Sequence, residues 1–398
     1  MKRVLLIGDS RRDAVGIASV MLKLRTNFNI AAYTCSFSAW QESLLNVAPH
    51  TVVLNHMIGD RNVAIAQSAK SIGGKVVILP TEGRPNTLDQ QQWYINQHSK
   101  NRGYIDLFLS WGAETDFLSP YLKTVVAGCP RMDVYKNMKV MRVLRDKTLG
   151  EYHNPKYNSI VVVFSSFPQA KFASIGTSFN EHDWKDLGVT GIPGRENPTK
   201  FAQSEQRARQ EFSVKVLEFA TNNKDTLFLV KPHPMEDFSY WDNLSMLAEN
   251  IKMAHLEPSH SLLSIADGCI SRLGCMTVLE SAWAGVSVKQ IAVGNDLDNP
   301  GNALDLYQET DGYKFIHISE EKANRYVANI GKSSNIVAKT IADMPVNKLD
   351  GRIVPNILKA EEIWARETEK SIKLPIDGIG QVRKNMTLVE VMESARWM

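Results

Sequence analysis

The chain has 398 residues, of which 43% are hydrophobic and 22% are charged, and its formal net charge is +3. A chain of this length predicts two domains of roughly 150 to 200 residues, each with its own core. The small net charge, and the lack of a Lys/Arg stripe interleaved with aromatic residues, argue against a nucleic-acid partner. No apolar run reaches the roughly 18 residues of a membrane span.

The N-terminal apolar run and the cysteines indicate the cellular compartment of the protein. Gly8 and Asp9 interrupt the N-terminal apolar run too early for a signal peptide. Four cysteines lie in or beside apolar segments without a Cys-x-x-Cys pair, as expected of reduced core thiols: Cys35, Cys129, Cys269 and Cys275. We therefore predict a cytoplasmic protein, and its mildly basic surface leaves association with an anionic membrane open.

Apolar strands alternate with helix-like segments in two series along the chain. The first series is Val4–Gly8, Ile30–Cys35, Thr51–Asn55, Lys75–Pro80, Leu107–Trp111 and Thr124–Ala127. The second series is Ser159–Phe164, Thr226–Val230, Ile251–Leu256, Gly268–Ser271, Val286–Val293 and Tyr313–Ile318. Continuous apolar strands followed by helices are typical of parallel sheets covered on both faces. The sequence therefore predicts an α/β fold with two Rossmann-like, doubly wound parallel-sheet domains.

The predicted domains are residues 1–150, residues 151–345, and C-terminal helices at 346–398 that cross back to the first domain. A basic helical segment, Lys136–Tyr157, is the expected linker. Further helices are expected at Glu320–Asn335, Val337–Met344, Ile357–Lys370 and Met386–Met398. The last of these has no stop signal, which leaves open that the chain is part of a longer protein.

A long connection, Gln169–Arg207, is rich in Gly, Ser, Asn and Pro and carries several aromatic residues. Connections of nearly forty residues are uncommon inside compact domains and are usually functional or disordered. We expect either a lid over the cleft between the domains or a floppy insertion.

The strand Thr226–Val230 ends abruptly in the tetrapeptide Lys-Pro-His-Pro234. Its C-terminal tip belongs to the edge at which open α/β sheets bind ligands. The two prolines stop the strand and hold the loop extended, so His233 has little conformational freedom left to lose. Lys231 and His233 at such a tip suit a phosphate group, and the alternative is a Pro-rich turn with a solvated histidine.

Gly274 separates the strand Gly268–Ser271 from an expected helix at Cys275–Ala284. The first N–H groups of that helix and its positive dipole end would face the same sheet edge, where an anion is stabilised. Taken alone, a glycine before an Ala-rich helix is equally typical of an ordinary strand-to-helix turn.

Polar side chains strengthen the case for a ligand at this helix. Ser271 and Thr277 supply hydroxyl groups, and Glu280 lies one turn after Thr277 on the same helix face. The Glu280 carboxylate could accept both hydroxyls of a ribose. Combined with Lys231 and His233, these residues predict a nucleotide–phosphate pocket.

Six motifs occur along the chain in a fixed order: Gly-Lys-Val-Val-Ile-Leu-Pro-Thr-Glu-Gly83, Leu-Ser-Trp-Gly112, Val-Ala-Gly-Cys-Pro-Arg-Met-Asp133, Val-Val-Phe-Ser-Ser-Phe167, Lys-Pro-His-Pro-Met-Glu236 and Ile-Ala-Asp-Gly-Cys-Ile-Ser271. In this order they resemble bacterial surface-carbohydrate biosynthesis proteins, which are similar to glycosyltransferases of the GT-B type. The His-Pro element followed by a serine-bearing element also resembles the CMP-sugar site of bacterial sialyltransferases and Kdo transferases. The resemblance spans about Lys75–Gly285 and favours the CMP-Kdo-dependent β-Kdo transferases.

The resemblance implies roles for residues of the donor site. It places Lys231 and His233 on the CMP phosphate, Ser271 and Thr277 beside it, and Glu280 on the ribose. It further implies that His260 lines the base, although a histidine at a helix start is equally typical of a protein surface. The remaining donor-binding residues that it implies are Ser165, Ser166, Glu236 and Gly274.

The resemblance also implies a catalytic carboxylate in the first domain. Glu82 stands where CMP-sialic acid enzymes have an acidic-acidic-Gly motif that acts on the acceptor, but Thr81 replaces the other acid. Catalysis and a simple turn cap therefore both stay open for Glu82. Asp9 and Asp13, after the first strand, are the other candidates, and His233 would assist departure of the phosphate.

The implied reaction moves an acidic sugar, most simply Kdo, from its CMP-activated form to a hydroxyl of a lipopolysaccharide O antigen or capsule. An inverting enzyme would use Glu82 as the base, and a retaining one would use a first-domain carboxylate as a nucleophile. The resemblance also leaves attachment to the cytoplasmic face of an inner membrane, or to an assembly complex, open. Alternatives are a CDP-polyol phosphotransferase, a UDP-sugar 2-epimerase and a non-catalytic nucleotide-binding subunit.

We expect no cofactor and no metal. Asp296-Leu-Asp298 spells the acidic triplet of metal-dependent sugar transferases, but it lies in a polar loop, Gly294–Asn302. A single leaving phosphate can be stabilised by a histidine, a lysine and a helix dipole. No His/Cys cluster has zinc spacing.

Overall fold

The computed structural model describes residues 1–8, 13–81, 88–173, 193, 195–234, 236–255, 257–298, 306–310, 312–351 and 354–373. The chain divides into two compact units. Unit 1 comprises Met1–Arg84, Gln92–Asp133 and Asn324–Met398, and unit 2 comprises Pro85–Gln91 and Val134–Ala323. Each unit contains one parallel sheet, as predicted.

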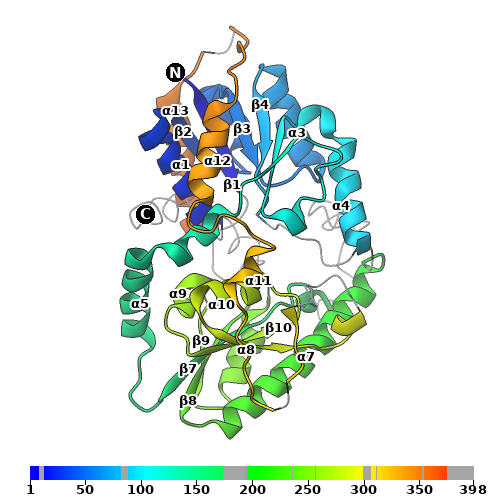
Figure 1. Ribbon diagram of the computed structural model, residues 1–398, viewed down its shortest axis with the longest axis vertical. Helices are drawn as coiled ribbons and strands as arrows, with labels where there is room; N and C mark the ends of the chain where they lie inside the picture. The colour runs from blue at the N-terminus through cyan, green and yellow to red at the C-terminus, as the bar shows by residue number, and fades with distance from the viewer. Residues whose placement is uncertain are drawn as a thin grey trace. The chain divides into compact units, whose positions relative to one another are not determined.

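The sheet of unit 1 has six strands among the described residues, in the order β2-β1-β3-β4-β5-β6 (Figure 1). They are β1 (Arg3–Gly8), β2 (Ala31–Ser36), β3 (Thr51–Leu54), β4 (Lys75–Ile78), β5 (Leu107–Ser110) and β6 (Thr124–Val126). All of their pairings are parallel. The strands follow the apolar runs, because a strand buried on both faces needs apolar side chains at every position.

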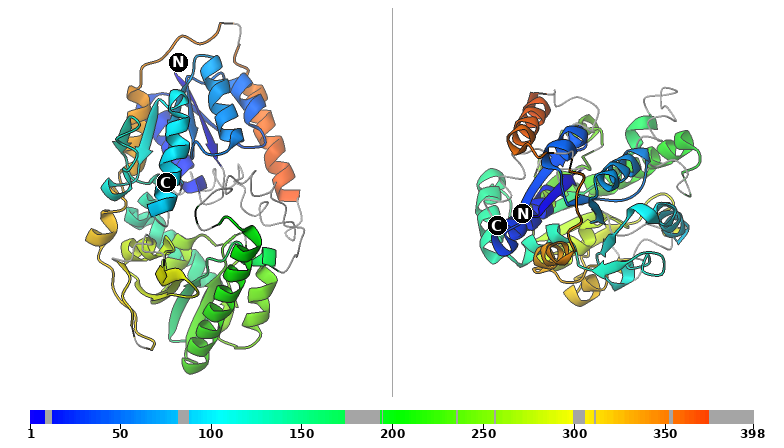
Figure 2. Two further views of the ribbon diagram at one scale, coloured as in Figure 1. Left: turned by 90° about the vertical axis from the view of Figure 1, so that its right-hand side faces the viewer. Right: turned by 90° about the horizontal axis from the view of Figure 1, so that it is seen from above.

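Helices cover both faces of this sheet, because alternate side chains of each strand point to opposite sides. On one face pack α1 (Ala14–Phe28) and α12 (Ser333–Asp343). On the other face pack α2 (Trp40–Val47), α3 (Asp60–Ser71), α4 (Leu88–Lys100) and α13 (Ile357–Lys373). Helix α13, orange-red in Figure 2, lies against α2, so the C-terminal part of the chain returns to unit 1.

Two of the sequence motifs hold this returning segment in place. Gly112 approaches the backbone so closely that an added Cβ would lie 2.6 Å from the carbonyl oxygen of Tyr326. Gly128, with φ of +85°, would place a Cβ 2.2 Å from the carbonyl oxygen of Ala328. Asp133 accepts hydrogen bonds from the backbone N–H groups at the start of α12, including that of Ser334 at 2.7 Å. These motifs therefore serve folding of unit 1.

The sheet of unit 2 has five strands among the described residues, in the order β11-β10-β7-β8-β9. They are β7 (Ser159–Phe164), β8 (Thr226–Lys231), β9 (Ile251–Met253), β10 (Gly268–Arg272) and β11 (Ser287–Ile291). The helices are α5 (Met138–Tyr152), α7 (Pro198–Asn222), α8 (Phe238–Ser245), α9 (Ser259–Leu263), α10 (Thr277–Ala284) and α11 (Glu320–Asn324). Short 3-10 turns include η5 (Ala170–Ala173) and η7 (Asp296–Asp298).

The second sheet is also covered on both faces. Helices α7 and α8 pack on the face that Val163, Val230 and Ile270 occupy. Helix α7 begins at Pro198, inside the segment predicted as a long connection, because Asn197 caps the N–H of Lys200 and Pro198 occupies the first turn. On the opposite face, the Cys269 thiol meets the hydroxyl of Ser281 on α10.

Several predicted elements need correction. Tyr313–Ile318 is not a strand, because only Ile316 pairs with Val288, in an isolated antiparallel bridge. The aromatic rings of this segment instead pack on the core around Phe228. The predicted helix Glu320–Asn335 is interrupted: α11 ends at Asn324 and α12 begins at Ser333, and Asn329 and Gly331 between them take positive φ values that a continuous helix does not allow.

Other predictions fall partly outside the described residues. The connection Gln169–Arg207 is described at η5 and from residue 195 onward, where α7 accounts for Pro198–Arg207. The predicted helix Met386–Met398 lies outside the described residues. No described helix combines the length and the hydropathy needed to cross a bilayer.

The four cysteines are free thiols, and three of them are buried, as predicted for core residues. Burial raises the pKa of Cys35 and Cys269 to about 12 and that of Cys129 to about 11. These three thiols are therefore poor nucleophiles at neutral pH.

Candidate functional site

The strand order of unit 2 places a candidate site at one edge of its sheet. From β7 the chain moves to β8 and β9 on one side and then crosses to β10 and β11 on the other. The order therefore reverses between β7 and β10, and open α/β sheets bind ligands at the C-terminal edge of such a switch point.

Lys231 and Ser271 lie in one row across this edge. Both are register partners of Phe164 on the central strand β7, Lys231 from β8 and Ser271 from β10. Partners in a parallel sheet point to the same face, and two strand spacings separate them by roughly 10 Å. A lysine and a hydroxyl group therefore lie on the same face of the sheet at this edge, on either side of Phe164.

A turn after β10 completes this side of the edge. Gly274 has φ of +81°, a conformation that favours glycine, and the N–H of Cys275 turns back to the carbonyl of Arg272. Helix α10 therefore begins at Thr277, two residues later than predicted. The hydroxyls of Ser271 and Thr277 lie 3.0 Å apart, so the structure brings these predicted residues together.

Glu236 lies beneath the His233 loop and organises it. Its Oε1 accepts the Ser165 hydroxyl at 2.7 Å and the backbone N–H groups of Phe167 and His233 at 2.9 and 3.1 Å. Its Oε2 accepts the indole N–H of Trp241 at 2.7 Å. Burial raises the pKa of this carboxyl. Four protein donors give Glu236 a positioning role, and a direct contact with a donor sugar stays a prediction.

Glu280 is buried on α10 and binds other protein groups. Its Oε2 accepts the hydroxyl of Tyr135 at 2.6 Å and also that of Ser259 at the start of α9. His260, half-buried, follows Ser259 in the same helix. The carboxylate thus joins α9, α10 and the segment before α5 at one end of the sheet. Its predicted contact with a ribose stays a prediction.

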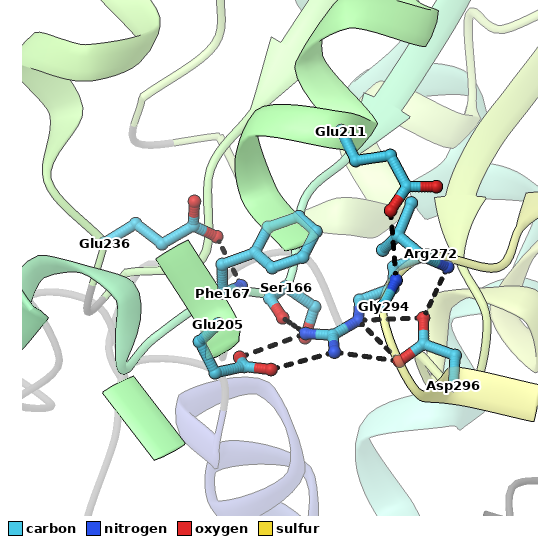
Figure 3. Close-up of polar contacts among 9 residues, drawn as sticks. Ser166, Phe167, Glu205, Glu211, Glu236, Arg272, Gly294 and Asp296 are labelled. Carbon is cyan, nitrogen blue, oxygen red and sulfur yellow. Dashed lines mark hydrogen bonds and ion pairs between the residues drawn. The ribbon is translucent and has the colours of Figure 1, made fainter. Parts of the chain in front are cut away.

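Arg272, which the sequence analysis did not single out, is the centre of a polar cluster at this edge (Figure 3). Its guanidinium pairs with Glu205 of α7 and Asp296 of η7, both at 2.8 Å. It also donates to the carbonyl of Ser166 at 2.8 Å and stacks 4.5 Å from the ring centroid of Phe167. Burial alone would lower the pKa of Arg272, but Glu205 and then Asp296 raise it above its ordinary value.

Asp296, the first residue of the acidic triplet Asp296-Leu-Asp298, belongs to this cluster. Both carboxylate oxygens of Asp296 accept from Arg272, and Oδ2 also accepts the N–H of Val293 at 3.1 Å. Asp296 therefore anchors the loop after β11. Among the residues that the structure describes, no cluster of three or more His, Cys, Asp or Glu side chains could hold a metal ion.

Unit 1 has a pocket at its own switch point, where β2 and β3 flank β1. The pocket has an empty volume of about 450 Å³, which includes the open space at its mouth. Its polar lining comes from Asp13, Asn55, Thr81 and Arg131, and Asp13 is buried. The structure thus places one of the three candidate carboxylates in a pocket. Glu82 and Asp9 lie outside the described residues.

The sequence predicted where the site residues lie along the chain, but it did not predict the side chains that hydrogen-bond to them. Ser165, Lys231, His233, Ser271 and Gly274 all lie at the predicted sheet edge, because strand ends can be read from apolar runs. Glu205 was assigned to the long connection, and Tyr135 to no site. An arginine directly after Ser271, at the end of a buried strand, was the one available signal, since a buried charge requires a partner.

No protein-family model matches the chain, and no curated protein matches it either. Solved structures do match. A UDP-GlcNAc 2-epimerase from Neisseria meningitidis bound to UDP-GlcNAc has a TM-score of 0.55 at 12% identity, covering 86% of this chain and 100% of that one. The S. aureus MnaA–UDP co-structure has a TM-score of 0.57 at 11% identity, covering 86% and 96%.

A third match is the UDP-GlcNAc 2-epimerase of Methanocaldococcus jannaschii in complex with UDP-GlcNAc and UDP. Its TM-score is 0.54 at 12% identity, covering 86% of this chain and 99% of that one. Likenesses at such low identity establish the fold. The chain has the GT-B type fold, with two parallel-sheet α/β domains, and this prediction from the sequence is confirmed.

Proposed function

We propose that the chain acts on a nucleotide-activated sugar in the synthesis of a bacterial surface carbohydrate. The proposal rests on one observation: Lys231 and Ser271 share a row at the switch-point edge of unit 2, with Thr277 and the start of α10 beside them. A lysine, hydroxyl donors and a helix N-terminus at such an edge are the groups that a nucleotide phosphate requires.

Within this class we favour glycosyl transfer, with CMP-Kdo as the donor and a surface polysaccharide or glycolipid as the acceptor. Departure of CMP develops charge on a single phosphate, which one lysine and one imidazole can stabilise. The oxocarbenium-like sugar centre requires a carboxylate. Asp13 is the candidate among the described residues, because it is buried in the pocket of unit 1.

Epimerisation of a UDP-sugar is the second candidate. It is favoured by the extent of the structural likeness, since the match covers 96 to 100% of the three chains named above, two of which are UDP-GlcNAc 2-epimerases. Those proteins were solved with UDP or UDP-GlcNAc bound. The reaction needs no polymer acceptor, so the identity of the nucleotide and the need for an acceptor separate the two candidates.

The experiment compares CMP release from CMP-Kdo, with and without a synthetic acceptor, with epimerisation of UDP-GlcNAc. We expect acceptor-dependent CMP release by the wild type and strong loss in His233→Ala. His153→Ala, at an exposed histidine that ends α5, is the matched control and should behave as wild type. Epimerisation of UDP-GlcNAc without release of CMP from CMP-Kdo would favour the epimerase over the transferase. If neither substrate is turned over, both reactions are contradicted for these substrates.

A further inference from the structure

The Ser166–Phe167 peptide is held at both ends by charged side chains, the buried Glu236 and Arg272, whose side chain is 14% exposed. The carbonyl oxygen of Ser166 accepts a hydrogen bond from Arg272 Nη1 at 2.8 Å. The N–H of Phe167 donates to Glu236 Oε1 at 2.9 Å. Both groups belong to one planar unit, so Arg272 and Glu236 together fix its orientation. Figure 3 shows this arrangement, with Glu236 and Arg272 on opposite sides of Phe167.

The guanidinium of Arg272 is fully committed to protein acceptors. Nε donates to Asp296, Nη1 to Ser166 and Glu205, and Nη2 to Glu205 and Asp296. An arginine has five N–H donors, and this set uses all of them. Arg272 is therefore not available to bind a phosphate directly, although it ends a strand at the candidate site.

The fixed peptide connects Arg272 to the His233 loop. Glu236 Oε1, which accepts from Phe167, also accepts the backbone N–H of His233 at 3.1 Å and the hydroxyl of Ser165 at 2.7 Å. Rotation of the peptide would withdraw one of the three donors of this oxygen, so the carboxylate, and with it the N–H of His233, could shift. Displacements of about 1 Å in a supporting group are enough to impair a binding site.

We propose that Arg272 is a positioning residue of the nucleotide site, acting through the Ser166–Phe167 peptide and Glu236 on His233. This inference rests on the proposed function. Lysine cannot replace it, because an ammonium is a point charge with three donors and cannot bridge two carboxylates and a carbonyl in one plane.

The first test measures CMP affinity by calorimetry, together with melting temperature, for Arg272→Lys. The control is Arg209→Lys, the same change at a buried arginine of α7 that stacks on Tyr240 outside this cluster. We expect a folded Arg272→Lys protein with at least tenfold weaker CMP binding and an Arg209→Lys protein within about twofold of wild type. Equal CMP affinity in Arg272→Lys and wild type would overturn the inference.

Two further measurements separate positioning from general stability. Hydrogen exchange at the Phe167 amide should accelerate in Arg272→Lys well below the melting temperature, and unchanged protection there would overturn the inference. The Glu236→Gln and Arg272→Lys effects on CMP affinity should be less than additive, since both act on one peptide. Fully additive losses would show independent roles.

If Arg272→Lys does not fold, Asp296→Asn gives the same test, because it keeps Arg272 and Glu205 and removes one carboxylate. Weaker CMP binding is then expected, and unchanged binding would overturn the inference. If the wild type binds no nucleotide, the proposed function itself is contradicted. If the wild type binds CMP and Arg272→Lys binds it equally tightly, the proposed function stands and only the role of Arg272 is contradicted.

Discussion

Tyr135 donates its hydroxyl hydrogen to Glu280 at 2.6 Å, and this bond links the segment before α5 to the helix that begins at the candidate phosphate site. Glu280 is 5% exposed, and the same carboxylate oxygen accepts from Ser259. The residue predicted to hold a ribose is therefore also a structural acceptor. Mutation can separate this structural role from the predicted contact with a ribose.

Glu280→Ala should lower both stability and nucleotide affinity. It leaves the buried hydroxyl of Tyr135 without its acceptor, which costs about 1–3 kcal/mol in unfolding free energy. Tyr135→Phe is the matched control, because it removes the same bond and keeps the carboxylate. Urea unfolding and CMP titration should show lost stability in both variants and lost affinity only in Glu280→Ala. If Glu280→Ala binds CMP as tightly as the wild type, Glu280 does not belong to the nucleotide site.

His233→Ala should reduce turnover by about two orders of magnitude, the usual effect of losing one transition-state donor. Its side chain is only partly buried, so the melting temperature should change little. Steady-state kinetics and thermal unfolding check the two parts together. A large loss of stability with proportionate loss of activity would instead make His233 a structural residue of the loop.

The stability of the wild type should depend on pH through Glu236. Burial raises the pKa of this carboxyl above its ordinary value of 4.5, so the folded state holds the proton more tightly than the unfolded chain. The contribution of Glu236 to the stability of the folded state is fully present below pH 4.5, and it is lost as the pH rises through the raised pKa of the folded state. Relative to Glu236→Gln, the wild type should therefore lose stability as the pH rises across this window. Unfolding of both proteins in urea at several pH values measures the difference, and a difference independent of pH would contradict the assignment.

Gly128→Ala should destabilise unit 1 strongly. Its φ of +85° costs a non-glycine residue about 1–2 kcal/mol. The added Cβ would also lie 2.3 Å from the hydroxyl oxygen of Ser333, so the start of α12 must move. Gly150→Ala is the control, because Gly150 lies in helix α5 with open space around it, and alanine there should stabilise by about 0.5–1 kcal/mol. Equal unfolding free energies for the two variants would refute the role of Gly128.

The sequence predicted those parts of the fold that depend on a local pattern of residues. The strand β8 and the loop after it could be placed because Thr226–Val230 is apolar and two prolines stop it. The start of α12 at Ser333 could not, because its capping carboxylate, Asp133, comes from 200 residues earlier in the chain.

The same limit applies to the candidate site. Glu205 and Arg272 are separated by 67 residues, and no periodicity in α7 indicates which of its acids faces the sheet edge. Tyr313–Ile318 was predicted as an apolar strand, but its apolar residues reflect packing of Tyr313 and Phe315 on the core around Phe228. Long-range polar partners are set by tertiary packing, so they became visible only in the structure.

A crystal structure with CMP tests the central claim most directly. We predict that the phosphate lies at the C-terminal edge of the second sheet, within hydrogen-bond distance of the Ser271 or Thr277 hydroxyl, and that the ribose lies next to Glu280. CMP bound away from this edge would contradict the account, as would a site that accepts UDP but leaves CMP unbound.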